Sequence, residues 1–247
     1  MGQVPFEYSY LLIGNGQLAR HLSRYLKQKN IAFHHWCRAH GTKSLETYLR
    51  NKPELVLLAI SDESIVSFYE EFNGLSLESS WLHFSGALHH PDLLNFHPLR
   101  SFATKEDFDF ESVGMISFQE NLKWTDLFPF SKNQTHHIPL SDKKLYHAIC
   151  ASMANLPQWI WLECLDFMKD KQLPESLFKN FITQSMDQVF SEGLDGVSGP
   201  IKRQDVYSIQ KNLNSLAKYS PNLKDVYELI QNQNTSLKEE LKNEKHI

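Results

Sequence analysis

The first 140 residues alternate short apolar runs with segments whose apolar positions recur at helical spacing. The apolar runs predict strands at Tyr8–Ile13, Ala32–Trp36 and Leu55–Ala59, with weaker candidates at Trp81–Phe84, near Phe96 and at Val113–Phe118. Helical spacing predicts helices at Gln17–Lys29, Ser44–Lys52 (with Ser44 as its N-cap) and Asp62–Phe72. Strands that alternate with helices in this way predict a parallel sheet covered by helices.

The pattern changes near residue 140. Ser141 is a candidate N-cap, and Asp142–Asp170 is predicted as one long helix with a kink at Pro157. Because this helix is apolar on more than one face, we expect it to be buried on most sides. Further helices are predicted at Pro174–Phe190, Pro200–Lys218 and Pro221–Lys242. We therefore expect an α/β domain over residues 1–140 and an all-α domain over residues 141–247.

Composition narrows the function classes. A chain of 247 residues with 41% hydrophobic residues can bury a core, and its net charge of −4 argues against a general nucleic-acid binder. Three cysteines without metal-type spacing predict neither a disulfide framework nor a metal centre. The apolar run Ala148–Met168 contains polar and charged residues, which favours a buried helix over a membrane span. With no leader pattern at the N-terminus, we expect a cytoplasmic protein without a membrane partner.

The sequence Gly14-Asn15-Gly16-Gln17-Leu18-Ala19 lies between a predicted strand and a predicted helix. This is the context in which a Gly-x-Gly-x-x-Ala turn holds the pyrophosphate of a dinucleotide, as in the Rossmann fold. Gly14 permits the tight turn, Gly16 allows the backbone to approach the phosphates, and the helix N-terminus offers free N–H groups. The alternative is that the turn is only a structural feature of the fold.

The end of the second predicted strand indicates which dinucleotide would bind. NAD-specific sites place an acidic residue there, but no acidic residue occurs between Tyr8 and Leu45. Arg38 is placed to receive a 2′-phosphate, with Thr42 and Lys43 nearby, because a guanidinium matches phosphate geometry. NADP is therefore predicted over NAD. The alternative is that Arg38 is an ordinary surface charge.

Two further segments follow predicted strands. Ile60-Ser61-Asp62 either passes over the cofactor or, in the case of Asp62, caps the next helix. The segment His83–His97 is rich in histidine, but its spacings match no metal motif, so no metal is predicted. His83 and Ser85 are expected at the carboxyl edge of the sheet, where a histidine can exchange the proton that accompanies hydride transfer. Gly86 indicates close approach of the backbone.

Several segments together resemble bacterial proteins that pair a Rossmann-like domain with a C-terminal domain of unknown function and are often described as NADP oxidoreductases. The wider group contains pyrroline-5-carboxylate reductase, ketopantoate reductase and 6-phosphogluconate dehydrogenase. The segments that carry the resemblance are Gly14–Ala19, His83–Leu88, His97–Phe102, Tyr146–Ala148 with Asn155, and Ser198–Asp205. The chain departs from this group at Ser198, where threonine is usual, and at Gln204, where glycine is usual.

The resemblance implies a helical C-terminal domain, like that of 6-phosphogluconate dehydrogenase, that forms a homodimer, with a small-molecule substrate held between the domains. The candidate catalytic residues are His83, His97, His147 and Asn155, the last as a substrate contact. Ser198 and Arg203 are candidate substrate-binding residues, in a glycine-containing loop whose positive charge suits an anionic substrate. The candidate cofactor-binding residues are Gly14, Asn15, Gly16, Gln17, Leu18, Arg38, Ile60, Ser61, Ser85 and Gly86.

These features predict an NADP-dependent oxidoreductase of unknown substrate. It would transfer hydride between nicotinamide and a small carbonyl or imine, or the corresponding alcohol or amine. One alternative is a non-catalytic dinucleotide-binding protein, a sensor or an assembly partner, that retains the fold. A metal-dependent hydrolase is a further alternative, which would require bound zinc.

Overall fold

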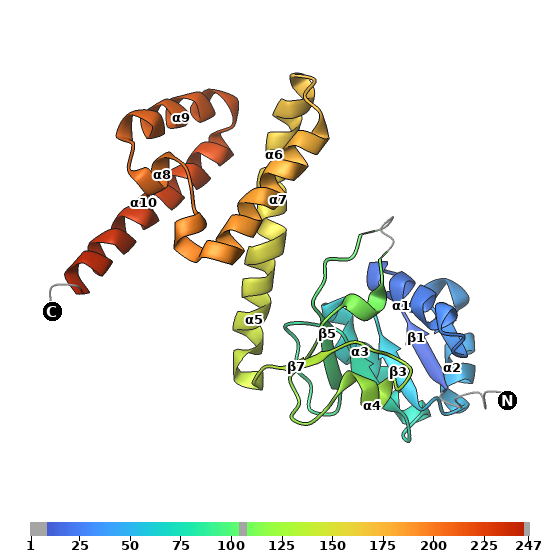
Figure 1. Ribbon diagram of the computed structural model, residues 1–247. Helices are drawn as coiled ribbons and strands as arrows, with labels where there is room; N and C mark the ends of the chain where they lie inside the picture. Colours follow the sequence, from blue (N-terminus) through green and yellow to red (C-terminus); the bar gives the residue numbers. More distant parts are fainter. Residues whose placement is uncertain (1–8, 104–107, 245–247) are drawn as a thin grey trace, which may run out of the picture. The chain divides into compact units, whose positions relative to one another are not determined.

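The computed structural model describes residues 9–103 and 108–244. The chain divides into two compact units, Met1–Ser152 and Met153–Ile247, and Figure 1 shows a mixed α/β first unit and a helical second unit. The sequence analysis places the boundary after residue 140. Residues 141–152 belong to the first unit because Lys143 and His147 contact the loop that follows the fourth strand.

The first unit is built on a seven-stranded sheet with the order β2-β1-β3-β4-β5-β6-β7. All neighbouring pairs are parallel except β5 and β6, which are antiparallel. The strands are β1 Tyr10–Ile13, β2 Phe33–Trp36, β3 Leu55–Leu58, β4 Ser80–His83, β5 Leu94–Pro98, β6 Met115–Ser117 and β7 Thr135–His137. The predicted parallel sheet is thus confirmed, although Tyr8 lies outside the described residues. The sequence analysis missed β7 because its Thr-His-His sequence has no apolar run.

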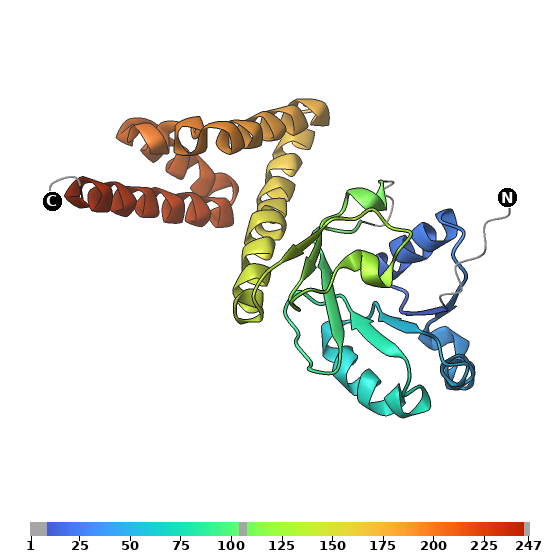
Figure 2. The same cartoon turned by 60° about the horizontal axis from the view of Figure 1, so that its bottom comes forward.

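Helices cover both faces of this sheet (Figure 2). The helices α1 Gln17–Gln28 and α4 Trp124–Leu127 cover one face, and α2 Thr42–Arg50 and α3 Asp62–Phe72 cover the other. The unit also contains α5 Lys143–Cys150 and short 3-10 turns at Arg38–His40, Asn73–Leu75, Phe110–Ser112 and Leu140–Asp142. Two predicted N-caps are wrong. Gly41 precedes α2, and the hydroxyl of Ser44 instead donates to the carbonyls of His40 and Gly41. Ser141 lies within the 3-10 turn that leads into α5.

The core of the first unit follows from the period of two along each strand. Leu12, Leu57 and Leu82 point to the face covered by α1 and α4, whereas Leu11 and Val56 point to the face covered by α2 and α3. All five are 0% exposed. Burying a leucine or valine side chain contributes about 1.5–3 kcal/mol, so this sheet is a rigid base for the loops at its edge.

The regular elements in residues 153–244, the described part of the second unit, are all helices. They are α6 Leu156–Asp170, α7 Glu175–Glu192, α8 Pro200–Arg203, α9 Val206–Tyr219 and α10 Pro221–Glu244. The helix predicted over Asp142–Asp170 forms as α5 and α6, joined by a π-helical turn at Ala151–Asn155. This wide turn ends two residues before Pro157, whose ring and missing N–H disturb regular helical hydrogen bonding.

The predicted helix Pro200–Lys218 is wrong as a single element. It is interrupted at Gln204, which has a φ of 57°, in the left-handed region that favours glycine. The side chain of Asp205 then accepts a hydrogen bond from the backbone N–H of Ser208 and starts α9. Gln204 is also the position at which the resemblance predicts glycine, so a turn that suits glycine is made here by a residue with a side chain.

The predicted burial of the long helix is not found within this chain. Leu145, Met153, Trp159 and Leu162 are between 53% and 71% exposed, because none of the described residues covers them. Of the helices in the described part of the chain, none has the length and apolar character needed to cross a membrane.

Candidate functional site

The glycine turn connects β1 to α1 and leaves two differently placed glycines. Gly14 has a φ of 133°, and a Cβ added to it would overlap the carbonyl oxygen of Ala59 at the end of β3. Gly14 is therefore required for the turn to pack against the neighbouring strand. Gly16 is the N-cap of α1, and a Cβ added there would meet no atom within 4 Å. Its missing side chain leaves open space at the helix N-terminus.

His35, which the sequence analysis did not single out, fixes this turn from β2. Its Nε2 lies 2.7 Å from the carbonyl oxygen of Gly14. Since a carbonyl only accepts, Nε2 carries the proton and donates. The N–H of Gly14 donates in turn to the carbonyl of Trp36 at 3.0 Å. Both polar groups of the Gly14 backbone are thus tied to β2.

A cavity of about 620 Å³ opens at the carboxyl ends of β1, β2, β3 and β4. Strand β1 has β2 on one side and β3 on the other, because the chain runs from β1 out to β2 and then returns across β1 to β3. The cavity therefore lies at the point where the strand order reverses. Open α/β sheets bind their ligands at such a point. The lining includes nine of the ten predicted cofactor-binding residues: Gly14, Asn15, Gly16, Gln17, Leu18, Arg38, Ile60, Ser61 and Ser85.

Gly86, the tenth, is not part of that lining. It lies instead against α5, where an added Cβ would overlap Nδ1 of His147. The close backbone approach that the sequence predicts at Gly86 therefore occurs, but toward a side chain of the same chain.

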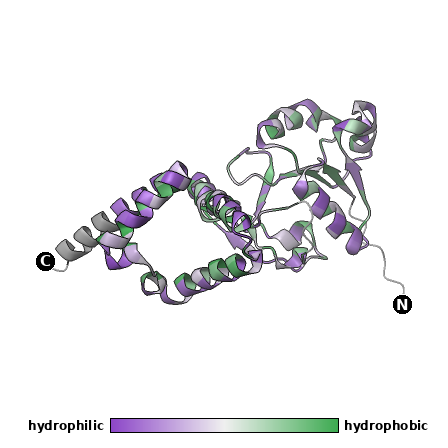
Figure 3. Cartoon of the chain, turned by 90° about the horizontal axis from the view of Figure 1, so that it is seen from above, coloured by the Kyte–Doolittle hydropathy of each residue, from purple (hydrophilic) through white to green (hydrophobic). Residues whose placement is uncertain are grey.

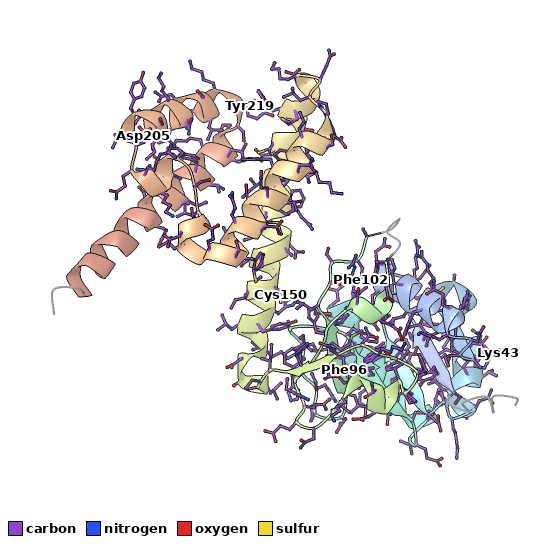
Figure 4. The ribbon with its side chains drawn as sticks, viewed as in Figure 1. Lys43, Phe96, Phe102, Cys150, Asp205 and Tyr219 are labelled. Atoms are coloured by element: carbon purple, nitrogen blue, oxygen red, sulfur yellow. The ribbon has the colours of Figure 1, made fainter. Side chains whose placement is uncertain are left out.

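Arg38 follows β2 as the first residue of the 3-10 turn Arg38–His40 and lines the cavity with an exposed side chain. Thr42 and Lys43 (Figure 4) lie at the start of α2 and do not line the cavity. A guanidinium in this position, with no acidic side chain on the same strand end, suits an anionic group such as a phosphate.

Asp62 is not the N-cap of α3, because Ser61 occupies that position and Asp62 is the first residue of the helix. The hydroxyl of Ser85 donates to Oδ2 of Asp62 at 2.5 Å. The same oxygen of Ser85 accepts the N–H groups of Ala87 and Leu88, at 3.2 and 2.9 Å. The carboxylate therefore lies at the cavity edge, fixed to the loop that follows β4.

A buried polar network lies behind this loop, and the sequence analysis missed it. Lys143 is 2% exposed, and its ammonium donates to the carbonyl of Leu88 and to Oδ1 of Asn95. The amide nitrogen of Asn95 donates to the carbonyls of His83 and Ser85, at 3.0 and 3.1 Å. Burial lowers the pKa of Lys143 to about 8. Lys143 was not predicted because two adjacent lysines at the start of a helix, Lys143 and Lys144, are typical of side chains exposed to solvent.

His83 lies at the carboxyl end of β4, as predicted, but it is 0% exposed and does not line the cavity. Its Nδ1 accepts the N–H of Ser85 at 3.3 Å, so Nε2 carries the proton and has no partner among the described residues. Burial lowers the pKa of His83 to about 3. The ring is therefore neutral at neutral pH and supports the Ser85 loop.

His97 and His147 come together with Tyr146, which was not predicted as a site residue. The hydroxyl of Tyr146 lies 2.8 Å from Nδ1 of His97, and the two histidine ring centroids are 5.7 Å apart. Burial lowers the pKa of His97 to about 4 and raises the pKa of Tyr146 above its usual value. Nδ1 of His147 has no partner among the described residues. The side chains of His97 and Tyr146 are therefore both neutral at neutral pH, and either one becomes charged when it gains or loses a proton.

The remaining predicted residues lie in the second unit. Asn155 ends the π-helical turn, Ser198 precedes Gly199, and Arg203 is the last residue of α8; all three side chains are exposed. Lys202 donates to the carbonyls of Leu194 and Asp195, at 2.7 and 2.9 Å, so its ammonium ties down the preceding turn. Asp205, labelled in Figure 4, caps α9. The substrate-contact roles of Asn155, Ser198 and Arg203 stay predictions.

Within the described ranges, no group of three or more histidine, cysteine, aspartate or glutamate residues is placed to hold a metal ion. This includes the histidine-rich segment from His83 to His97.

In sequence, residues 122–234 match a domain of unknown function (DUF2520). No curated protein matches the chain significantly.

Solved structures resemble the chain along nearly its whole length. A Bacteroides fragilis protein described as a candidate NADP oxidoreductase superposes with a TM-score of 0.75 at 19% identity, over 92% of this chain and 97% of the other. Plasmodium falciparum pyrroline carboxylate reductase, solved with NADP bound, gives 0.53 at 14% identity, over 93% and 98%. An imine reductase variant from Myxococcus stipitatus, in complex with NAD+, gives 0.57 at 10% identity, over 93% and 94%.

At these identities the likeness establishes the fold. The chain has an N-terminal Rossmann-type α/β unit followed by a helical unit, which is the fold class predicted from its sequence.

Proposed function

We propose that the protein is an NADP-dependent oxidoreductase that transfers hydride between the nicotinamide and a small carbonyl or imine, or the corresponding alcohol or amine. The observation that carries this proposal is the cavity at the switch point, lined by the glycine turn on one strand end and by Arg38 on the next. The structural neighbours described as NADP- or NAD-bound reductases support the same class of ligand.

The residues present fit a dinucleotide. The open space at Gly16 lies where α1 presents its free N–H groups and positive dipole end, so a pyrophosphate can approach the backbone there. Arg38 would hold a 2′-phosphate through paired hydrogen bonds, which favours NADP over NAD. The nicotinamide would then lie toward Ser61 and Ser85, on the other side of the glycine turn.

When bound, the nicotinamide supplies or accepts the hydride. The chain's own contribution is the placement of a proton. His97 and Tyr146, joined by a hydrogen bond of 2.8 Å, are the candidate pair for this exchange, and the one that gives or takes the proton would carry a charge until the proton is restored. His83 would act indirectly, by fixing Ser85. The Lys143–Asn95 contacts hold the loop from Ser85 to Leu88 in place.

We also propose that the protein is a homodimer formed through its second unit. Phe181 and Phe190 on α7 are 67% and 76% exposed, and Trp159 on α6 is 71% exposed. Hydrophobic residues, green in Figure 3, recur along the helices of this unit. Exposed apolar surface of this extent is unusual in a monomer and typical of an interface.

The test is a comparison of NADPH and NADH affinity in the wild type, in Arg38→Gln and in the control Lys43→Gln. Lys43 carries the same charge nearby but does not line the cavity. We expect Arg38→Gln to weaken NADPH at least about tenfold, the lower end of what charged hydrogen bonds contribute, and to leave NADH unchanged. No binding of either nucleotide to the wild type would overturn the proposal.

A second measurement tests turnover, with NADPH oxidation followed across a panel of carbonyls and imines. We expect His97→Gln and Tyr146→Phe to lower kcat with little change in NADPH affinity. NADPH that binds but is never oxidised would favour the non-catalytic dinucleotide-binding alternative.

A further inference from the structure

The cavity has charge of opposite sign on its two sides. Among its described lining residues, Arg38 and Asp62 are the charged ones. Arg38 follows β2 and Asp62 follows β3, with β1 and its glycine turn between them. Since neighbouring strands are about 4.8 Å apart, the two strand ends are separated by about 10 Å. A cation thus marks one side of the turn and a carboxylate the other.

The Asp62 carboxylate is held in place. It begins α3, and the hydroxyl of Ser85 donates to it at 2.5 Å. Its neighbour Glu63 is exposed in the same first turn and does not line the cavity. The fold therefore directs one of two adjacent acidic side chains to the ligand space.

The positively charged or titratable groups that interact with Asp62 do not line the cavity. The carboxylate acts on Lys143 and on His97, whose pKa values it raises against the effect of burial. Lys143 is 2% exposed and does not line the cavity, and the lowered pKa keeps His97 neutral at neutral pH. The N-terminus of α3 contributes a partial positive charge that offsets only part of a full carboxylate. On this side the carboxylate of Asp62 is therefore the charged group that a ligand contacts directly, whereas the ammonium of Lys143 is buried away from the cavity.

We propose that Asp62 makes the site discriminate between the two redox states of the dinucleotide and favours the oxidised form. This inference rests on the proposed function. The oxidised nicotinamide ring carries one positive charge and the reduced ring none, whereas the phosphates are the same in both. Arg38 acts on both forms alike, and the carboxylate stabilises only the cationic ring. The site therefore responds to the ratio of oxidised to reduced cofactor, and a reductase built on it is inhibited by its oxidised cofactor.

The test measures dissociation constants of NADP+ and NADPH by titration calorimetry for the wild type, Asp62→Asn and the control Glu63→Gln. Asparagine keeps the size of the side chain and an oxygen that accepts from Ser85. We expect Asp62→Asn to weaken NADP+ about three- to tenfold, as for one charge pair at a partly exposed site. NADPH should change less than about twofold, and Glu63→Gln should change neither. Added salt should shrink the effect.

The binding measurements separate a failure of the charge proposal from a failure of the proposed function. If the wild type binds both forms and Asp62→Asn weakens them equally, the residue acts by a hydrogen bond common to both, and the charge proposal is overturned. The same holds if Glu63→Gln shifts the ratio as much as Asp62→Asn. If the wild type binds neither form, the proposed function fails before this inference is reached.

Discussion

The two units of this chain differ in how they bury their apolar residues. In the first unit the strands β1 and β3 are completely buried on both faces, and helices from the same unit supply the cover. In the described part of the second unit, Ile209 and Leu213 are the buried apolar side chains, and no residue of α6 or α7 is buried.

The difference does not lie in hydrophobic content, because α6 carries Trp159, Ile160, Trp161, Leu162 and Leu165. The difference between the units lies in the number of layers of secondary structure that pack on one another. A sheet with helices on both faces closes its own core, whereas the pair α6 and α7 leaves a groove of about 560 Å³ between them, lined by Trp161, Phe178 and Ile182 among others. The first unit supplies every described lining residue of the cavity at the glycine turn, and we infer that the second unit depends on a second copy of the chain to cover its apolar faces.

The largest expected effect is a loss of stability of the first unit when its glycine turn is changed. Gly14→Ala places a Cβ against the carbonyl of Ala59 at a φ of 133°, so we expect a loss of about 3–5 kcal/mol of unfolding free energy. Gly16→Ala, two residues away, meets no atom within 4 Å and should stay within about 0.5 kcal/mol. Chemical denaturation of both variants provides the measurement. Equal stability of the two would contradict the packing described at Gly14.

The next effect tests the second unit. Trp159→Asp places a charge on an apolar face, and if a second copy covers that face the dimer should weaken by about 2–4 kcal/mol. Leu77→Asp is the control, because Leu77 is 84% exposed but lies in the first unit; its effect should stay within about 0.5 kcal/mol. Sedimentation equilibrium and the concentration dependence of Tm report the difference. A monomeric wild type, or identical behaviour of both variants, would rule out the dimer.

A third effect is the response of the first unit to acid. The pKa of His83 falls from 6.5 to about 3 in the fold, so below pH 6.5 the unfolded chain binds a proton that the folded chain does not. The contribution of His83 to stability is therefore complete above pH 6.5 and decreases as the pH falls toward 3. Lowering the pH to 4.5 should remove about 2–3 kcal/mol through His83, in addition to a further loss through His97, whose pKa is lowered to about 4. His83→Gln should show a smaller decrease over this window. Matching acid profiles of wild type and variant would show that His83 is protonated in the fold.

The smallest effect concerns the turn between α8 and α9. Gln204 holds a φ of 57°, where a side chain costs about 1 kcal/mol relative to glycine. We expect Gln204→Gly to raise the stability of the second unit by up to about 1 kcal/mol. Gln210→Gly, in the middle of α9, is the control and should lower it by about the same amount. Thermal unfolding measures both.

The sequence predicted those parts of the fold that depend on local patterns. The strand at Leu55, the helix at Asp62 and the turn at Gly14 and Gly16 each carry their signal within a few residues. Capping was predicted less well, because Ser44 and Ser141 occur near helix starts whose exact position depends on tertiary packing. The turn at Gln204 was missed because its residue type does not favour the conformation it adopts.

Some residues of the candidate site could likewise be predicted from local sequence, and others could not. Residues adjacent to a strand end, such as Arg38, Ser61 and Ser85, could be predicted because parallel strands bring their carboxyl ends to one edge. His35, Asn95 and Lys143 could not, since their roles depend on contacts across long stretches of sequence, 48 residues in the case of Lys143 and Asn95. No local pattern distinguishes a buried lysine from a solvated one.

The most direct test of the central claim, that the first unit binds a nicotinamide dinucleotide at its glycine turn, is the NADPH affinity of wild type and Gly16→Ala under identical conditions. Because the variant should fold as the wild type does, a change in affinity reports on the ligand alone. We predict that the wild type binds NADPH and that Gly16→Ala binds it at least about tenfold more weakly, as expected when a Cβ enters a close backbone–phosphate contact. Equal affinity of the two proteins, or no binding by either, would contradict the claim.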